Sequence, residues 1–192
     1  MSELKLEAYG PEGDPSKHLS MDELNAGLEA LPAAPSDSGT LELIVRRLPD
    51  GSRETPEATR LTLEEGVPGD AWNRRPPRKP DAQITVIRMD IARLMAGGQP
   101  VTHSGDNLFV DLDLAAENLP PGTRLRVGKA QVEVTPEPHN GCLKFKGRFG
   151  QDALRFVQDP ATRPENRRGI YWRVVEPGDV SVGAAIEVIS RP

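Results

Sequence analysis

The chain has 192 residues, enough for one domain with a single hydrophobic core, and its formal net charge of −5 is modest and built from both signs. This balance predicts neither a nucleic-acid partner nor an anionic membrane surface, and an aromatic content of 4% leaves few rings on which bases could stack. A single cysteine excludes an intrachain disulfide, and no apolar run approaches the roughly 18 to 20 residues of a membrane span. The first residues also lack the basic end and the apolar stretch of a secretory signal. We therefore expect a cytoplasmic protein.

The first forty residues predict an N-terminal extension with one short helix. Ser20 and Glu23 have the spacing of a capping box, in which each side chain satisfies a backbone N–H at the start of a helix. Three leucines then fall on one helical face: Leu24, Leu28 and Leu31. We therefore predict a helix over residues 21–31 and divide the chain into an extension, residues 1–40, and a main domain, residues 41–192.

From residue 41 onward the apolar residues alternate with polar ones, as is typical of strands. Strands are predicted at residues 41–45, 61–63, 84–87, 108–114, 124–127, 131–135, 170–175 and 185–189. Short helices are predicted at residues 90–95, before Gly97 and Gly98, and near residues 153–157. So many short strands with only brief helices between them predict a mainly β fold, a closed or nearly closed β-barrel with an N-terminal helical appendage.

The segment of residues 138–150 is the candidate chemical centre. Common phosphate-loop, dinucleotide, zinc and serine-hydrolase motifs are absent from the sequence, whereas this segment places Lys144, Lys146, Arg148 and His139 near Cys142. Positive surroundings favour the thiolate, which is the form that binds metals or attacks electrophiles. A lone cysteine is also often a small buried hydrophobe, so an inert Cys142 stays open as an alternative.

Several short motifs follow one another around this cysteine. They are GVPGD at residues 66–70, GDNL at 105–108, PGTRLRVG at 121–128, RFG at 148–150, RGIY at 168–171 and PGDVSVG at 177–183. Their order resembles the MOSC domain, named for the C-terminal portion of molybdenum-cofactor sulfurases, over roughly residues 41–189. The chain is similar to small, stand-alone bacterial-type members of that family.

The resemblance implies a barrel with a cleft in which the family cysteine ligates the molybdenum of a bound pterin cofactor or carries a sulfur atom. Cys142 occupies that position, as metal ligand and catalytic residue, and a soft thiolate suits both roles. The leading hypothesis is a molybdenum-cofactor protein that acts as an oxidoreductase on N-hydroxylated small molecules. A persulfide carrier and a non-catalytic binding barrel remain as alternatives.

A pterin cofactor carries a phosphate, so the resemblance also implies nearby cations and polar groups. Candidate cofactor-binding residues are His139, Asn140, Lys144, Arg148, Asp106, Asn107, Arg74 and Arg75, with Arg78 and Lys79 in the same loop as the last two. The loop cations are equally explained as a solvated charge run, and Asp106 and Asn107 as a turn before a strand. We expect no pyridoxal phosphate in this chain alone, and an electron-transfer partner or a cysteine desulfurase acting in trans.

Overall fold

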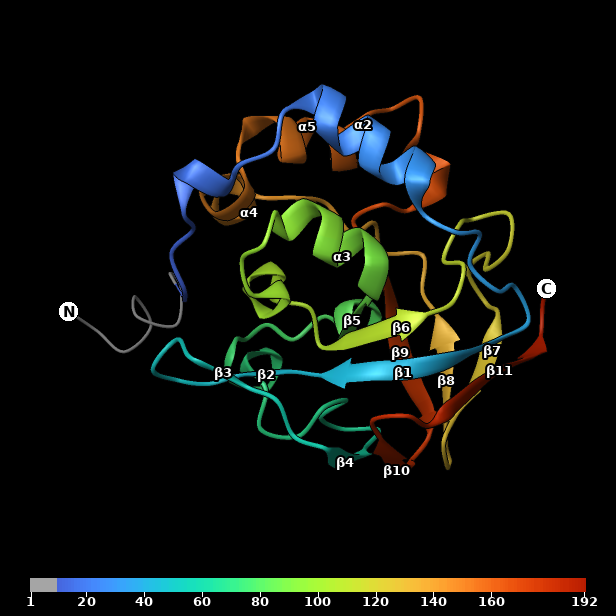
Figure 1. Ribbon diagram of the computed structural model, residues 1–192. Helices are drawn as coiled ribbons and strands as arrows, with labels where there is room; N and C mark the ends of the chain where they lie inside the picture. Colours follow the sequence, from blue (N-terminus) through green and yellow to red (C-terminus); the bar gives the residue numbers. More distant parts are fainter. Residues whose placement is uncertain (1–9) are drawn as a thin grey trace.

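Seven strands close into one barrel in the computed structural model of the protein, which describes residues 10–192 (Figure 1). Around the barrel the order is β1 (Ser38–Ile44), β11 (Ala185–Ser190), β7 (Arg124–Val127), β8 (Ala130–Val134), β9 (Ile170–Glu176), β5 (Ile84–Arg88) and β6 (Leu108–Asp111). Two small sheets accompany it: β2 (Arg46–Arg47) with β3 (Arg53–Glu54), and β4 (Ala58–Leu61) with β10 (Gly178–Ser181). The prediction of a mainly β fold with a closed barrel is confirmed.

The strand pair β5–β6 determines where the helices begin to cover the barrel. Within residues 10–192 the barrel neighbours pair antiparallel except for β5 and β6, which are parallel. Parallel neighbours need a crossover connection, and this one contains α3 (Met89–Ala96) and η4 (Val101–Ser104). Gly97 ends α3 in a left-handed conformation with φ 56°, as predicted. The crossover returns the chain to β6 through Gly105 and Asp106.

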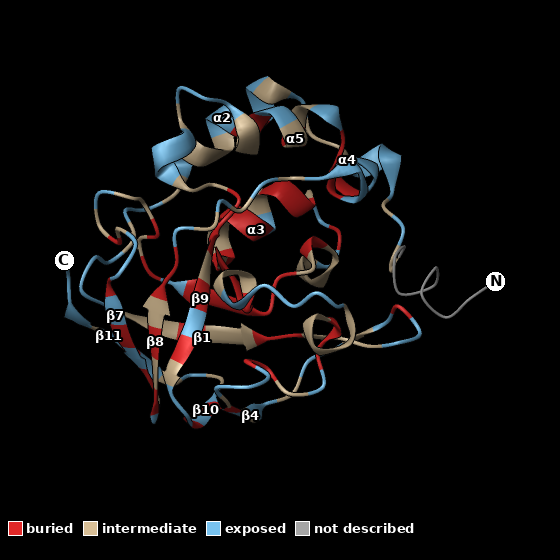
Figure 2. Ribbon diagram, turned by 180° about the vertical axis from the view of Figure 1, so that it is seen from behind, coloured by how far each residue is buried: buried red, intermediate tan, exposed pale blue. Residues whose placement is uncertain are grey.

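Two hydrophobic clusters stabilise the structure, one inside the barrel and one between the barrel and the helices. Strand alternation sends successive residues of β6 into different clusters: Leu108 and Val110 point into the barrel, whereas Phe109 packs under the helices. Ile87 of β5 joins Phe109 in the outer cluster. Figure 2 shows α3 largely buried beneath the outer helical layer. This side of the barrel is therefore apolar on both faces of its strands.

The outer layer contains α2 (Met21–Ala30), α4 (Leu143–Phe149) and α5 (Gln151–Gln158) (Figure 1). The predicted helix over residues 21–31 is confirmed as α2, and its capping box between Ser20 and Glu23 is present. Leu24 of α2 is fully buried in the outer cluster, so this helix shares the hydrophobic packing of α3 and α5. Strand β1 begins at Ser38, inside the segment that was predicted as the extension.

Some predicted bounds differ from the structure for local reasons. The strand predicted at residues 61–63 ends at Leu61, and Leu63 is 50% exposed because a bridge between Thr62 and Gly66 closes a turn there. The strand predicted at 108–114 ends at Asp111, before the side chain of Asp113 accepts the N–H of Ala115 in a turn. The helix α4, directly after the cysteine, was not predicted.

The remaining short helices lie in loops: η1 (Pro15–Lys17), η2 (Ala71–Arg74), η3 (Pro80–Ala82) and η5 (Arg163–Glu165). None of the helices within residues 10–192 combines the length and the apolarity needed to cross a bilayer.

Candidate functional site

A cavity of about 270 Å³ lies beside Cys142. Its walls come from β2, β3, the loop after η2, β5, the end of η4, the loop before α4, α4 itself, the loop before β9 and the start of β9. Six lining residues are cationic and, in the part of the chain that the structure describes, none is Asp or Glu. The six are Arg47, Arg53, Arg75, Lys144, Arg148 and Arg168. We refer to this cavity as the cationic pocket.

Cys142 is exposed to solvent and lines the cationic pocket. Its backbone is extended, with φ −128° and ψ 178°, and its carbonyl accepts the N–H of Lys146 at 3.0 Å, so the residue stands at the N-cap of α4. The side chain makes no capping hydrogen bond. The alternative in which Cys142 is buried among apolar side chains is therefore wrong, because the turn into α4 leaves the thiol at the surface of the pocket.

Asp70 holds Arg47 in the pocket wall from behind. Its carboxylate accepts the backbone N–H of Arg47 at 2.8 Å and the Arg47 Nε–H at 3.0 Å, and it caps η2 by accepting the N–H of Trp72 at 3.0 Å. Burial acts to lower the pKa of Arg47, but the charge and hydrogen bonds of Asp70 together with the charge of Asp106 outweigh it, and the pKa is raised. Burial acts to raise the pKa of Asp70, but the charge and hydrogen bonds of Arg47 together with the N–H of Trp72 outweigh it, and the pKa is lowered. Arg47 is thus a fixed cation.

A second buried carboxylate, Asp106, holds Arg168 in another part of the pocket wall. Nη1 of Arg168 lies 2.9 and 2.8 Å from the two oxygens of Asp106, and Nη2 donates to the carbonyl of Ser104 at 3.2 Å. The guanidinium also lies over the ring of Phe145, 5.0 Å from its centroid. Both charges are nearly inaccessible to solvent, so the pair is fixed in one geometry.

His139 completes this wall. Its Nε2 lies 3.8 Å from Oδ1 of Asp106, and its ring centroid lies 4.5 Å from that of Tyr171. Burial lowers the pKa of His139 well below the ordinary value of 6.5, and the nearby charges of Arg168 and Arg47 lower it further. The imidazole is therefore neutral at neutral pH, although it lies among cations.

The other cations repel one another. Burial and the charges of Arg148 and Arg47 lower the pKa of Arg53 to about 10. Burial also lowers the pKa of Lys144, with the charge of Arg75 acting in the same direction and that of Cys142 opposing it. The pKa of Arg148 is lowered by burial, against the charge of Cys142. A bound anion would relieve this repulsion, so the pocket favours an anionic ligand.

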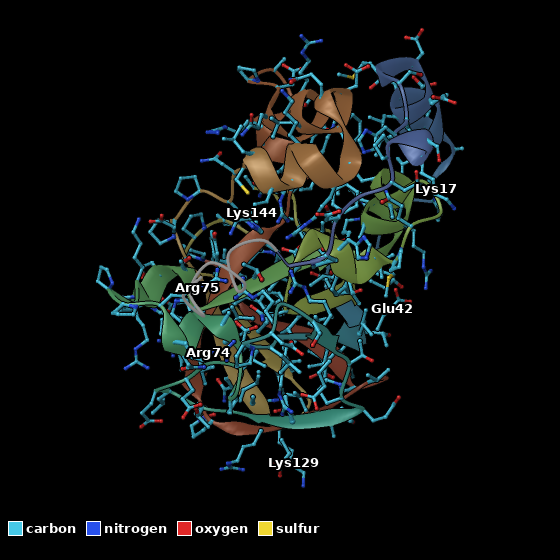
Figure 3. All side chains as sticks on the ribbon, turned by 90° about the vertical axis from the view of Figure 1, so that its left-hand side faces the viewer. Lys17, Glu42, Arg74, Arg75, Lys129 and Lys144 are labelled. Atoms are coloured by element: carbon cyan, nitrogen blue, oxygen red, sulfur yellow. The ribbon has the colours of Figure 1, made fainter. Side chains whose placement is uncertain are left out.

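The structure brings most of the predicted site residues into the lining of the cationic pocket: Cys142, His139, Asn140, Lys144, Arg148 and Arg75. Asp106 lies behind the wall as the partner of Arg168. Figure 3 shows Arg75 nearer to Lys144 and α4 than Arg74 is. Arg74 is outside the lining and donates instead to the carbonyls of Gly69 and Arg47 at 2.8 and 2.6 Å.

Asn107 also lies outside the lining and has a structural position. Its Oδ1 accepts hydrogen bonds from the backbone N–H and the hydroxyl of Thr85 at 3.1 and 2.9 Å, and its Nδ2 donates to the carbonyl of Val45 at 3.2 Å. The side chain therefore connects the end of β1 to β5. Its own backbone N–H donates to the Thr85 hydroxyl at 2.9 Å.

Within residues 10–192, eight residues in the pocket lining were not predicted as site residues from the sequence, and four of them are arginines or the tyrosine. Arg168 and Tyr171 belong to the RGIY motif, which was used only to identify the family, so a signal for them was present. Arg47 and Arg53 follow β1, in a stretch without any recognisable motif. Nothing in the sequence distinguishes these two arginines from other surface cations.

Comparisons of the sequence with known proteins identify a family. Residues 69–187, more than half of the chain, match the family model described as the MOSC domain. The chain is also 37% identical over 89 residues to the uncharacterized protein YflK of Bacillus subtilis strain 168. That alignment covers 45% of this chain and 37% of the relative, so the chain spans well under two thirds of the relative's length.

Solved structures share the fold at lower sequence identity. YiiM from Escherichia coli superposes with a TM-score of 0.56 and 22% identity, over 80% of this chain and 71% of that chain. The YuaD protein of Bacillus subtilis superposes with a TM-score of 0.55 and 20% identity, over 81% of this chain and 97% of that one. These two structures show that the fold is shared. The match of the family model over residues 69–187 shows that the chain belongs to the MOSC domain family.

Proposed function

We propose that the protein binds the molybdenum cofactor in the cationic pocket, with Cys142 as a ligand of the metal, and acts as an oxidoreductase on N-hydroxylated small molecules. The observation that carries the proposal is an exposed thiol in the wall of a cavity that six cations line. Family membership supports the choice of this cofactor, because the MOSC family is associated with it.

Unpartnered polar atoms around the pocket fit a polar, phosphate-bearing ligand. Nε of Arg53, Nδ1 of His139 and Nε of Arg168 are buried and have no hydrogen-bond partner, and all three residues line the pocket. Buried polar groups without partners are costly. A pterin with its phosphate has both donors and acceptors, so it could satisfy these atoms together with the repelling cations.

Different residues of the pocket would bind different parts of the cofactor. Arg53, Arg75 and Lys144 would hold the phosphate, and the Cys142 thiolate would occupy one coordination position of the metal. When bound, the cofactor would supply two-electron redox chemistry at the metal. A metal that arrives bound to its pterin needs few ligands from the protein. Within residues 10–192, no cluster of three His, Cys, Asp or Glu side chains forms a separate metal site.

The proposed net reaction converts R–NHOH, two electrons and two protons into R–NH₂ and water. The N–O bond breaks, the oxygen leaves as water, and the nitrogen keeps the added electrons. A separate electron-transfer protein is the proposed source of the electrons. Tyr171 and Lys144 line the same pocket as Cys142 and could each hold a proton there.

The test compares the protein with its Cys142→Ser variant after production in cells that make the cofactor. Native mass spectrometry and molybdenum analysis are expected to find one pterin and one metal per chain in the wild type and a strong loss in the variant. Because Cys142 is exposed, its replacement should leave thermal unfolding unchanged. Wild-type protein that carries neither molybdenum nor pterin, even when cofactor is supplied, would overturn the proposal.

The same exposed thiol also suits a persulfide carrier that receives sulfur from a cysteine desulfurase. The position of Cys142 beside Lys144 and Arg148 would stabilise an anionic persulfide as well as a thiolate. Mass spectrometry separates the two functions: a carrier gains the mass of one sulfur on Cys142, and mild reduction removes it. A chain that carries this adduct but no molybdenum would favour the carrier.

A further inference from the structure

A second hollow of about 390 Å³ lies between residues 11–13 and α4. Its walls are lined by Pro11, Glu12, Gly13, Leu143, Lys144, Gly147 and Arg148. We call this hollow the α4 groove. Small-molecule sites typically have volumes of roughly 300 to 1,000 Å³, so the volume of the groove fits an organic ligand.

The segment of residues 11–14, which faces α4 across the groove, is held in place by hydrogen bonds that involve Arg148 and Gln99. The Pro11 carbonyl accepts the Nε–H of Arg148 at 3.0 Å, and Gln99 donates to the Arg148 carbonyl at 2.9 Å while accepting the N–H of Asp14 at 2.7 Å. A Cβ added to Gly13 would stand 2.3 Å from the Cα of Arg148, so the two segments pack directly against each other. The two walls of the α4 groove are therefore held in a fixed position by the fold.

Leu143 is an apolar residue of α4 that packs in neither hydrophobic cluster. Its side chain is 82% exposed, whereas the other apolar residues of α4, Phe145 and Phe149, are 2% and 1% exposed in the outer cluster. Leu143 directly follows Cys142 in the chain. Lys144 and Arg148 line both the α4 groove and the cationic pocket, so the two cavities are neighbours.

We propose that the α4 groove binds the apolar body of a neutral small-molecule substrate whose polar end reaches Cys142. This inference rests on the proposed function, because it assigns the polar pocket to the cofactor and the adjacent apolar groove to the substrate. Glu12, Lys144 and Arg148 line the groove, so charges of both signs border it. The Arg148 guanidinium already donates to the carbonyls of Pro11 and His103. The exposed side chain of Leu143 and the glycines Gly13 and Gly147 favour an uncharged ring.

Gly147 offers a direct way to fill the groove. A Cβ added there meets no atom within 4 Å, so a larger side chain has room and extends into the space that Gly147 lines. Glycine is also a poorer helix former than alanine or leucine, so α4 should tolerate the change. Lys146→Leu is the matched control, because it adds an apolar side chain to an exposed position of α4 that lines neither cavity.

The experiment titrates the full chain as isolated with N-phenylhydroxylamine and follows the Leu143 methyl and Gly147 amide signals by NMR. Saturable shifts at both positions are expected for the wild type and for Lys146→Leu. Affinity should fall at least tenfold in Gly147→Leu and several-fold in Leu143→Ala. Pyrophosphate, a probe of the cationic pocket, should bind all four proteins within about twofold of one another.

The outcomes separate the two proposals. Probe binding that is lost in Gly147→Leu supports the groove even if the chain carries no molybdenum, in which case only the proposed function fails. Equal affinity of Gly147→Leu and wild type, or shifts confined to other surfaces, would overturn the groove assignment even in a molybdenum-loaded protein. A dimer in sedimentation that Gly147→Leu dissociates would also overturn it, by assigning the groove to a second copy.

Discussion

At the scale of single residues, His139 shows how the fold controls charge in the cationic pocket. Its imidazole is enclosed by Tyr171, Asp106 and Arg168, and Nδ1 is buried without a partner. Because its pKa is held well below the ordinary value, the ring adds no further positive charge to the pocket. It can instead offer a neutral hydrogen-bonding group to a ligand.

The neutral state of His139 predicts a dependence of stability on pH. An unfolded histidine has a pKa of about 6.5, so below that pH the unfolded chain binds a proton that the folded protein excludes, and acidification destabilises the fold. Between about pH 7.5 and about pH 5.5 the wild type should lose about 1 kcal/mol more free energy of unfolding than His139→Gln. Urea titrations measure this difference. Equal losses in the two proteins would contradict a buried neutral His139.

At the scale of elements, α2 lies outside residues 69–187 yet is part of the outer hydrophobic cluster. Its fully buried Leu24 joins the cluster that also contains Phe145 and Phe149 of α4. The backbone carbonyl at the end of α4 is held by the preceding segment as well, since Nε2 of His18 lies 3.1 Å from the Arg148 carbonyl. The N-terminal elements therefore support the helix that follows Cys142.

Replacing Leu24 by alanine should test whether α2 stabilises the rest of the domain. Leu24→Ala leaves a cavity in the outer cluster and should lower the free energy of unfolding by about 2 to 5 kcal/mol. Glu29→Ala, at an exposed position of the same helix, is the control and should change it by less than about 0.5 kcal/mol. Chemical denaturation followed by circular dichroism measures both. A Leu24→Ala effect as small as that of the control would show that α2 does not stabilise the domain.

At the scale of the whole molecule, charge is distributed unevenly. The chain has a net charge of −5, yet six cations meet in one cavity. Two of them, Arg47 and Arg168, are balanced by the buried carboxylates Asp70 and Asp106. The low aqueous screening inside a cavity strengthens the field of the others. An acidic protein can therefore bind an anion locally.

The salt dependence of anion binding should report the positive potential inside the cationic pocket. Pyrophosphate affinity, measured by calorimetry, should fall several-fold when ionic strength rises from about 0.05 M to about 0.5 M, because the Debye length shortens. Arg53→Gln should weaken binding about tenfold and make it less sensitive to salt. Arg60→Gln is the control, because Arg60 is exposed on β4 and pairs with Asp179 away from the pocket. Equal effects of the two variants would contradict a localised anion site.

Local patterns in the sequence were sufficient for the closed barrel, the capping box of α2 and the segment around Cys142. Alternating apolar residues report which side of a strand is buried, and a capping box depends on neighbours along the chain, so both are visible without the fold. The cluster of His139, Cys142, Lys144 and Arg148 was visible because these residues are close in sequence.

Only the tertiary structure decided which distant residues share the pocket. The packing of the small β2–β3 sheet beside the barrel brings Arg47 and Arg53 into the same cavity as α4, and no local pattern encodes that approach. Barrel closure turns Asn107 toward Thr85 and Val45, where its hydrogen bonds hold strands together, although its position in the sequence predicted a cofactor contact. Periodicity records whether a side chain is buried, whereas its partners depend on how segments far apart in the chain pack together.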